Sequence, residues 1–173
     1  MWGDIMFKIK PWVNEKKLSE NKEKKSRFYW SDFSGCLYFY DRGYLCKSHG
    51  TGKPVGFGYW VLTDTWSLTQ AYLEYPKNPD KLYAIGELTS FKLIPDGDHL
   101  FFEMFNEPKK SKYLEFRIKE SEFLVALINL SENLLEIVDK WADLSKDDIV
   151  KTIKERLAVL KQKHINGNLR ADK

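Results

Sequence analysis

The feature that most constrains the fold is a change in hydrophobic period near residue 120. Before it, residues 112–119 alternate between an apolar face of Leu114, Phe116 and Ile118 and a charged face of Glu115, Arg117 and Lys119. Such alternation is typical of an antiparallel strand with one face in water. After it, apolar residues recur at the spacing of one helix face, at Phe123, Leu127, Leu130, Leu134, Val138 and Trp141, widened by Leu124, Ile128 and Leu135.

Strands followed by helices predict an α+β fold. We expect one domain over 1–173, with a strand-rich part at 1–119, a helical part at 120–165 and a frayed tail at 166–173. The expected architecture is a curved antiparallel sheet, or two, of about six to eight strands, followed by two C-terminal helices packed on one face. A chain of 173 residues can bury a core without a disulfide or a metal.

Within the strand-rich part, we expect strands at 5–13, 59–63 and 99–105, and one or two strands over 82–94. The Lys/Glu-rich run at 14–27 has almost nothing to bury, which predicts a mobile surface loop.

The segment 64–75 is ambiguous, with a helix slightly favoured over a strand. Leu68, Ala71, Tyr72 and Tyr75 share one helix face. Ser67 with Gln70 resembles a capping box, and Pro76 would stop the helix. The Thr, Trp and Tyr content of the same segment suits a strand.

A second C-terminal helix is expected to start at a Ser145 cap with Asp148 at its third position. Asn166-Gly167 is expected to end it. Its predicted apolar face consists of Ile149, Ile153, Leu157 and Leu160.

Charge, cysteine content and the apolar segments restrict the partners and the cellular compartment expected for the protein. A net charge of +3 is much weaker than that of a dedicated duplex-DNA binder. Cys36 and Cys46 lie on adjacent candidate strands; two buried free thiols in a reducing compartment are favoured over a disulfide. The N-terminus lacks a signal-peptide pattern, and the apolar stretch 123–130 is too short to span a bilayer. A cytoplasmic protein without membrane contact is expected.

Glycine and cysteine motifs for phosphate or metal binding are incomplete. Gly50-Thr51-Gly52-Lys53-Pro54 fails as a phosphate-binding loop, because Lys47 replaces the first glycine and Pro54 stands where Ser or Thr should bind magnesium. Cys36, Cys46 and His49 are the only soft-ligand cluster, and it lacks a fourth ligand. No cofactor or metal is predicted.

Acid–base catalysis would have to use His49, His99 or His164. A two-histidine nuclease would need His49 and His99 to face each other beside Lys47 or Lys53. Nothing in the sequence brings them together, so no catalytic residue and no enzyme activity are predicted.

What remains is a set of large amphipathic side chains. Aromatic residues make up 15% of the chain, and aromatics with arginine are the types that form binding hot spots. Alternation along strands turns roughly half of them inward. The candidate partner-binding residues are Tyr38, Tyr40, Arg42, Trp60, Trp66, Tyr72 and Tyr75.

In overall character, as a small single domain without motifs, the chain resembles bacterial immunity proteins that neutralise toxins of contact-dependent growth inhibition systems. The resemblance implies a cognate toxin domain as the protein partner, and it assigns a role to no residue. The mild basicity departs from inhibitors of nuclease toxins, which are often acidic.

Two alternatives stay open. The order of strands and helices also resembles the Whirly-type arrangement, which implies a single-stranded nucleic-acid binder that uses stacked aromatics and lysines. That alternative requires lysines and exposed aromatics to share one groove. The other is a histidine-dependent phosphodiesterase or nuclease.

Overall fold

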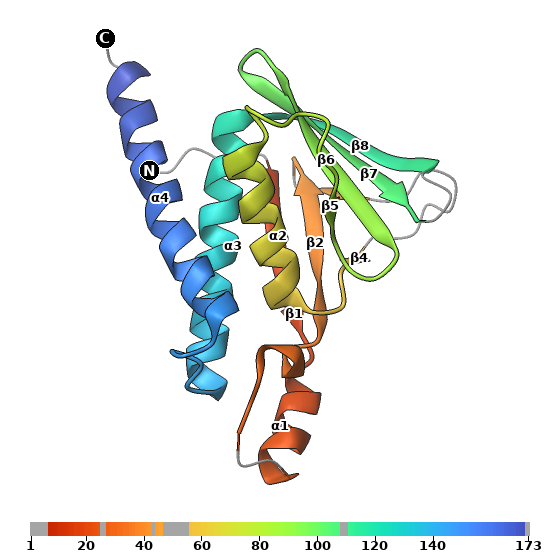
Figure 1. Cartoon of the computed structure of the whole chain (residues 1–173), viewed down its shortest axis with the longest axis vertical. Coiled ribbons are helices and arrows are strands. Elements are labelled where there is room, and N and C mark those ends of the chain that lie inside the picture. The colour runs from red at the N-terminus through yellow and green to blue at the C-terminus, as the bar shows by residue number, and fades with distance from the viewer. Residues whose placement is uncertain (1–6, 25–26, 43, 47–55, 108–110, 172–173) are drawn as a thin grey trace.

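The structure of the protein, a computed structural model, describes residues 7–24, 27–42, 44–46, 56–107 and 111–171 (Figure 1). The first half contains β1 (Phe7–Val13), α1 (Glu15–Lys24), a 3₁₀ turn η1 (Trp30–Asp32), β2 (Gly35–Asp41), β3 (Tyr44–Leu45), β4 (Gly56–Phe57) and α2 (Val61–Glu74). The second half contains β5 (Tyr83–Ala84), β6 (Thr89–Asp96), β7 (His99–Asn106), β8 (Ser111–Lys119), α3 (Glu120–Trp141) and α4 (Asp148–Ala171).

The strands form two separate antiparallel sheets. The first sheet has the order β1-β2-β3, with β4 also paired to β2, and the second has the order β5-β6-β7-β8. The predicted α+β class and antiparallel pairing are therefore confirmed. The predicted curvature is not, because neither sheet is closed or strongly curled.

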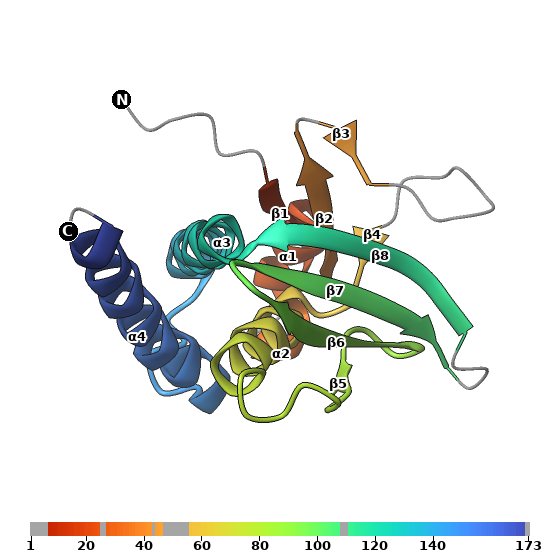
Figure 2. The ribbon, with the colours of Figure 1, turned by 90° about the horizontal axis from the view of Figure 1, so that it is seen from above.

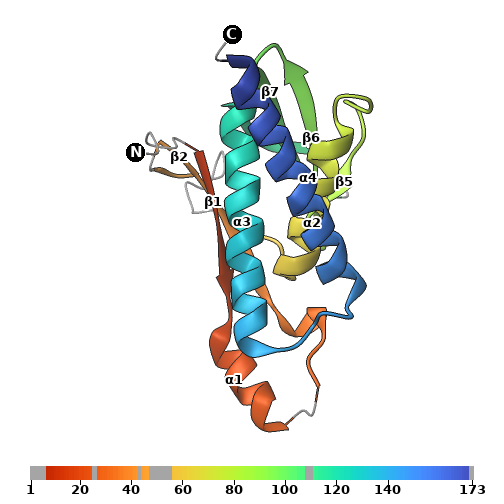
Figure 3. The same cartoon turned by 90° about the vertical axis from the view of Figure 1, so that its left-hand side faces the viewer.

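The helices form layers beside the strands. Figure 2 shows α2 and α3 between α4 and the strands. α3 packs along β1, whereas the main contacts of α4 are with α3 and α2 (Figure 3). The expectation that both C-terminal helices pack on a sheet thus holds for α3, while α4 forms an outer layer.

A cluster of phenylalanines joins the inner faces of both sheets to α3. Phe39 of the first sheet lies 5.3 Å from Phe102 of the second, measured between ring centroids. Phe7 and Phe102 each lie 6.0 Å from Phe123 of α3. Phe7, Phe39, Phe102 and Phe123 are all 0% exposed, so the two sheets share one core.

The predicted loop at 14–27 was wrong, because residues 15–24 form α1. Asn14 caps this helix, with its Oδ1 accepting a hydrogen bond from the N–H of Lys17 at 3.1 Å. Glu15 in the first turn and Lys22 in the last suit the helix dipole. One residue, Leu18, is fully buried and fixes α1 to the core.

The predicted strand at 59–63 was also wrong. Trp60 makes one isolated bridge to Ser34, and α2 starts at Val61. The helix favoured over 64–75 is confirmed and begins earlier. Ser67 is not a cap: it lies inside α2, and its hydroxyl donates to the Ala84 carbonyl at 2.6 Å.

The apolar stripe of α3 is confirmed, but both predicted boundaries of α4 were wrong. Phe123, Leu127 and Leu130 are fully buried, as predicted. The cap of α4 is Asp147 rather than Ser145, since its Oδ1 accepts from the N–H groups of Ile149 and Val150. The helix also continues past Asn166-Gly167 to Ala171, into the predicted frayed tail.

Two remaining expectations concern the cysteines and the membrane. Cys36 and Cys46 are free thiols, as favoured, although both are half-buried rather than buried. Burial raises the pKa of Cys46 to about 11 and keeps it protonated at neutral pH. Across the ranges that the structure describes, no helix has the length and apolar character to cross a membrane.

Candidate partner-binding pocket

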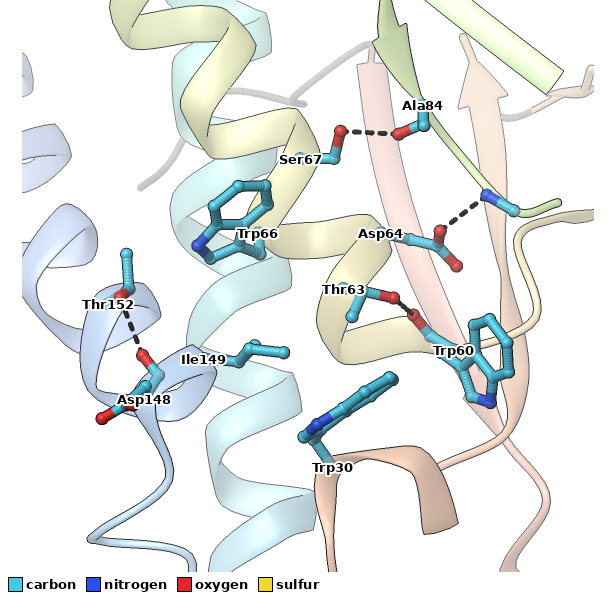
Figure 4. A pocket seen from close by; sticks show the side chains of 11 residues that line it. Trp30, Trp60, Thr63, Asp64, Trp66, Ser67, Ala84, Asp148, Ile149 and Thr152 are labelled. Atoms are coloured by element: carbon cyan, nitrogen blue, oxygen red, sulfur yellow. Dashed lines mark hydrogen bonds between the residues drawn. The ribbon is translucent and has the colours of Figure 1, made fainter.

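Three tryptophans, Trp30 in η1, Trp60 at the start of α2 and Trp66 within α2, line one open cavity of about 580 Å³. Figure 4 shows Trp30, Trp60 and Trp66 around the same space, with Ile149 and Asp148 contributed by α4. We call this cavity the tryptophan pocket and define it by Trp30, Trp60, Asp64, Trp66, Asp148 and Ile149. Its size and its mainly apolar lining are those of a ligand or side-chain binding site.

Trp30 is held by the 3₁₀ turn that contains it. The buried carboxylate of Asp32 accepts a hydrogen bond from the N–H of Tyr29 at 2.9 Å, which closes the turn around Trp30. The Trp30 ring then meets the Trp60 ring edge to face at 5.8 Å between centroids. This is a favoured geometry for an aromatic pair.

Trp60 is fixed by the start of α2. Its carbonyl accepts hydrogen bonds from the N–H of Asp64 at 3.0 Å and from the Thr63 hydroxyl at 2.9 Å. The bridge to Ser34 ties the same residue to the segment before β2. The backbone of Trp60 therefore joins the first sheet to the pocket.

Arg156 of α4 holds Trp66 in place. The Arg156 guanidinium lies 4.7 Å from the centre of the Trp66 ring and donates to the Trp66 carbonyl at 2.6 Å. Cation–π contact and a charge-assisted hydrogen bond thus act on one residue. Burial lowers the pKa of Arg156, but an arginine remains charged at neutral pH.

Asp64 connects the loops around the pocket and is only 3% exposed. Its Oδ1 accepts from the N–H of Gly86 at 2.8 Å, which links α2 to the loop between β5 and β6. Its Oδ2 has no hydrogen bond of normal geometry. Burial raises the pKa of Asp64 to about 6, against the opposing effect of the nearby Gly86, Tyr59 and Trp60 amides.

Close packing against Asp64 also explains a glycine. Gly58 has a φ of +91°, and a Cβ atom there would lie 1.8 Å from Oδ2 of Asp64. Only glycine fits this position. The Gly58 loop, Asp64 and the Gly86 loop form one packed unit beside the pocket.

Asp148 provides an exposed negative charge at the pocket. Its side chain is 98% exposed, and its nearest cation is Lys151 at 3.5 Å on the next turn of α4. Exposed pairs of this kind contribute little to stability. The carboxylate is therefore accessible to a partner.

The seven predicted binding residues fall into three groups. Trp60 and Trp66 line the tryptophan pocket. Tyr72 and Tyr75 are 2% and 4% exposed, which places them in the core instead of at a surface. Tyr38 and Tyr40 lie on β2 of the first sheet, and Arg42 lies in the turn that follows it.

Sequence reasoning missed Trp30, Asp64, Asp148 and Ile149. Ile149 was expected in the core and Asp148 in a helix cap. No motif links these positions, because they come from three separate elements, η1, α2 and α4. A tryptophan beside a capping aspartate, as in Trp30-Ser31-Asp32, was the one local signal available.

The residues considered for catalysis or phosphate binding do not lie together among the described residues. His49, Lys47 and the Gly50–Pro54 loop lie outside them. His99 starts β7 and its Nδ1 lies 2.6 Å from Asp98, while His164 lies in α4. Within the described ranges, no three His, Cys, Asp or Glu side chains are grouped to hold a metal.

Comparisons of the chain with protein-family models, with curated proteins and with solved structures gave no match.

Proposed function

We propose that this protein binds a protein partner through the tryptophan pocket, and that the partner is a toxin domain which it neutralises. The observation that carries the proposal is the meeting of Trp30, Trp60 and Trp66 around one open cavity. Tryptophan is among the residues most enriched in binding hot spots, which lie in concave, well-packed positions. The resemblance in character to toxin-immunity proteins supports the choice of a toxin domain.

The pocket fits a basic side chain of the partner. Indole faces attract cations, and the aliphatic stem of an arginine or lysine suits apolar walls. The exposed Asp148 carboxylate would pair with its charged end. Arg156 already shows this type of contact on Trp66 within the chain.

The pocket is also preorganised. The Trp60 and Trp66 carbonyls accept hydrogen bonds from Thr63 and Arg156, and the Trp30 carbonyl accepts one from the N–H of Phe33. Side chains that are already ordered lose less conformational entropy on binding. A rigid aromatic site is therefore suited to tight association.

The test uses the C-terminal domain encoded by the gene directly upstream, expressed from an inducible promoter with and without this protein. We expect the wild type to restore growth, and Trp66→Ala to weaken binding about 30-fold or more in calorimetry. Asp148→Lys should weaken it about tenfold, because it places like charges together. Asp139→Lys is the matched control on the exposed surface of α3.

Two results would overturn the proposal. One is growth arrest that the wild-type protein does not relieve. The other is full protection by both Trp66→Ala and Asp148→Lys while circular dichroism shows that the variants are folded.

A further inference from the structure

The outer face of the first sheet carries lysines opposite aromatics. Along β1, Lys8, Lys10 and Trp12 alternate with buried Phe7 and Ile9. The antiparallel register places Lys8 opposite Tyr40, Lys10 opposite Tyr38 and Trp12 opposite Cys36. We call this surface the lysine–aromatic face and define it by Lys8, Lys10, Trp12, Tyr38 and Tyr40.

Its side chains are accessible. Trp12 is 51% exposed, both lysines are exposed, and both tyrosines are half-buried. The Lys10 ammonium lies 5.2 Å from the centre of the Tyr40 ring, so the cation rests beside an aromatic surface. The face thus combines large planar rings with positive charge.

No carboxylate of the described residues forms an ion pair with this positive charge. In the part of the chain that the structure describes, neither Lys8 nor Lys10 has a carboxylate within salt-bridge distance. None of the outward positions of β1 and β2 at this face is acidic. An external anion can therefore pair with both lysines.

A shallow groove continues this face toward α3. It has a volume of about 230 Å³ and is lined by Lys8, Lys10, Asn129 and Asn133 among others. Each asparagine amide offers both donors and acceptors. Such groups can hydrogen-bond to the donors and acceptors on base edges as well as to phosphate oxygens.

We infer that the lysine–aromatic face binds single-stranded nucleic acid. Lys8 and Lys10 contact phosphates, bases stack on Trp12 and the two tyrosines, and the amides of Asn129 and Asn133 meet base edges. Unpaired bases can stack on aromatic side chains of a sheet, while the bases of a duplex are already stacked. This inference does not rest on the proposed partner binding, which uses a different surface.

The test measures fluorescence anisotropy of labelled single-stranded DNA and RNA of about 12 nucleotides, a length within the usual site size. The wild type should bind in the micromolar range or tighter. Two phosphate contacts predict an affinity that falls about sevenfold between 50 and 200 mM salt. A blunt duplex of the same sequence should bind at least about tenfold more weakly.

Variants separate the contributions. Lys8→Ala with Lys10→Ala should remove most of the salt dependence, and Trp12→Ala should weaken binding about tenfold at every salt concentration. Lys112→Ala on the second sheet is the matched control, because Lys112 is an exposed strand lysine paired with Glu103 and Glu115. Trp66→Ala in the tryptophan pocket should leave oligonucleotide binding unchanged.

Three outcomes would overturn the inference: no binding at low salt, equal loss in Lys112→Ala and in the double lysine variant, or equal affinity for the duplex. Loss of toxin protection in Trp12→Ala, without any oligonucleotide binding by the wild type, would instead assign this face to a protein partner. Failure of the toxin experiment alone leaves the oligonucleotide result unaffected.

Discussion

Both sheets alternate buried and exposed residues along their strands, and both contribute to one core. Their outer faces differ in whether the basic side chains form ion pairs. On the second sheet, Lys92 and Lys112 both pair with Glu103, and Arg117 pairs with Asp96 at 2.7 Å. On the first sheet, Lys10 lies beside a tyrosine ring. Among the described residues, Lys92, Lys112 and Arg117 of the second sheet have ion pairs, whereas Lys8 and Lys10 of the first sheet have none.

This difference shows that the net charge of the chain does not indicate which of its surfaces has basic side chains without an acidic partner. A total of +3 is spread over 28 basic and 25 acidic residues, so function depends on where the two signs are paired. Pairing across strands is set by register. Register places Glu103 between Lys92 and Glu115, whereas it places Tyr40 and Tyr38 opposite Lys8 and Lys10.

The largest effect is expected where the two sheets are alike, in their common core. Phe102→Ala removes a fully buried ring that contacts Phe39, Phe91, Phe116 and Phe123. We expect it to lower the free energy of unfolding by about 3–5 kcal/mol, as measured by urea denaturation. If the two sheets share one core, the urea unfolding transitions followed by fluorescence and by circular dichroism should coincide. Separate transitions would contradict the shared core.

A second effect concerns Asp64 of α2. Its carboxylate accepts a hydrogen bond from the N–H of Gly86 and so links α2 to the loop between β5 and β6 of the second sheet. Its pKa of about 6 in the folded protein lies above the ordinary value of 3.8. The folded state therefore binds more protons between these values, and its stability falls as pH rises from about 4 to about 6, by about 3 kcal/mol.

Urea denaturation across this pH range measures the effect. Asp64→Asn cannot titrate and should lose this part of the pH dependence, whatever its absolute stability. Parallel pH profiles for the wild type and Asp64→Asn would contradict the assignment.

The smallest effect tests the contrast between the outer faces directly. Burial raises the pKa of Glu103, but hydrogen bonds and charges from Lys112 and Lys92 outweigh it and hold the pKa below its usual value. Glu103→Gln should cost about 1 kcal/mol of stability in thermal melts, because it leaves two lysines without this carboxylate. It should also give the second sheet a weak, salt-sensitive affinity for oligonucleotides.

Glu115→Gln is the control, since among the described residues Glu115 forms an ion pair with Lys112 and with no other cation. We expect it to change stability by less than about 0.5 kcal/mol. Equal losses in the two variants would mean that the double pairing of Glu103 has no special role.

Local periodicity predicted the elements whose burial is regular along the sequence. α3 buries its stripe against β1, α2 and α4, and β8 buries Leu114 and Ile118. In both elements the buried residues recur at the local period, so the pattern shows in the sequence. α1 has one buried residue, Leu18, which leaves no stripe to detect. Its Asn14 cap and charge order were the available signals, and the dense lysines obscured them.

The sites were harder to predict because they depend on register and on tertiary contact. The sequence contains the lysines and tyrosines of the first sheet, but only the pairing of Lys10 with Tyr38 puts them on one face. Tyr72 has the same residue type as Tyr40 and is buried, with its hydroxyl donating to Glu120 at 3.0 Å. Residue type alone does not separate these two roles.

The contact between Arg156 and Trp66 has a consequence for the timing of folding. It joins residues 90 positions apart, and α4 also supplies Asp148 and Ile149 to the pocket. During synthesis the N-terminal part of the chain is made first, and contacts between distant residues form late. The nascent chain therefore contains Trp30, Trp60 and Trp66 long before the pocket is complete, and the pocket can form only after α4 has been made and has docked.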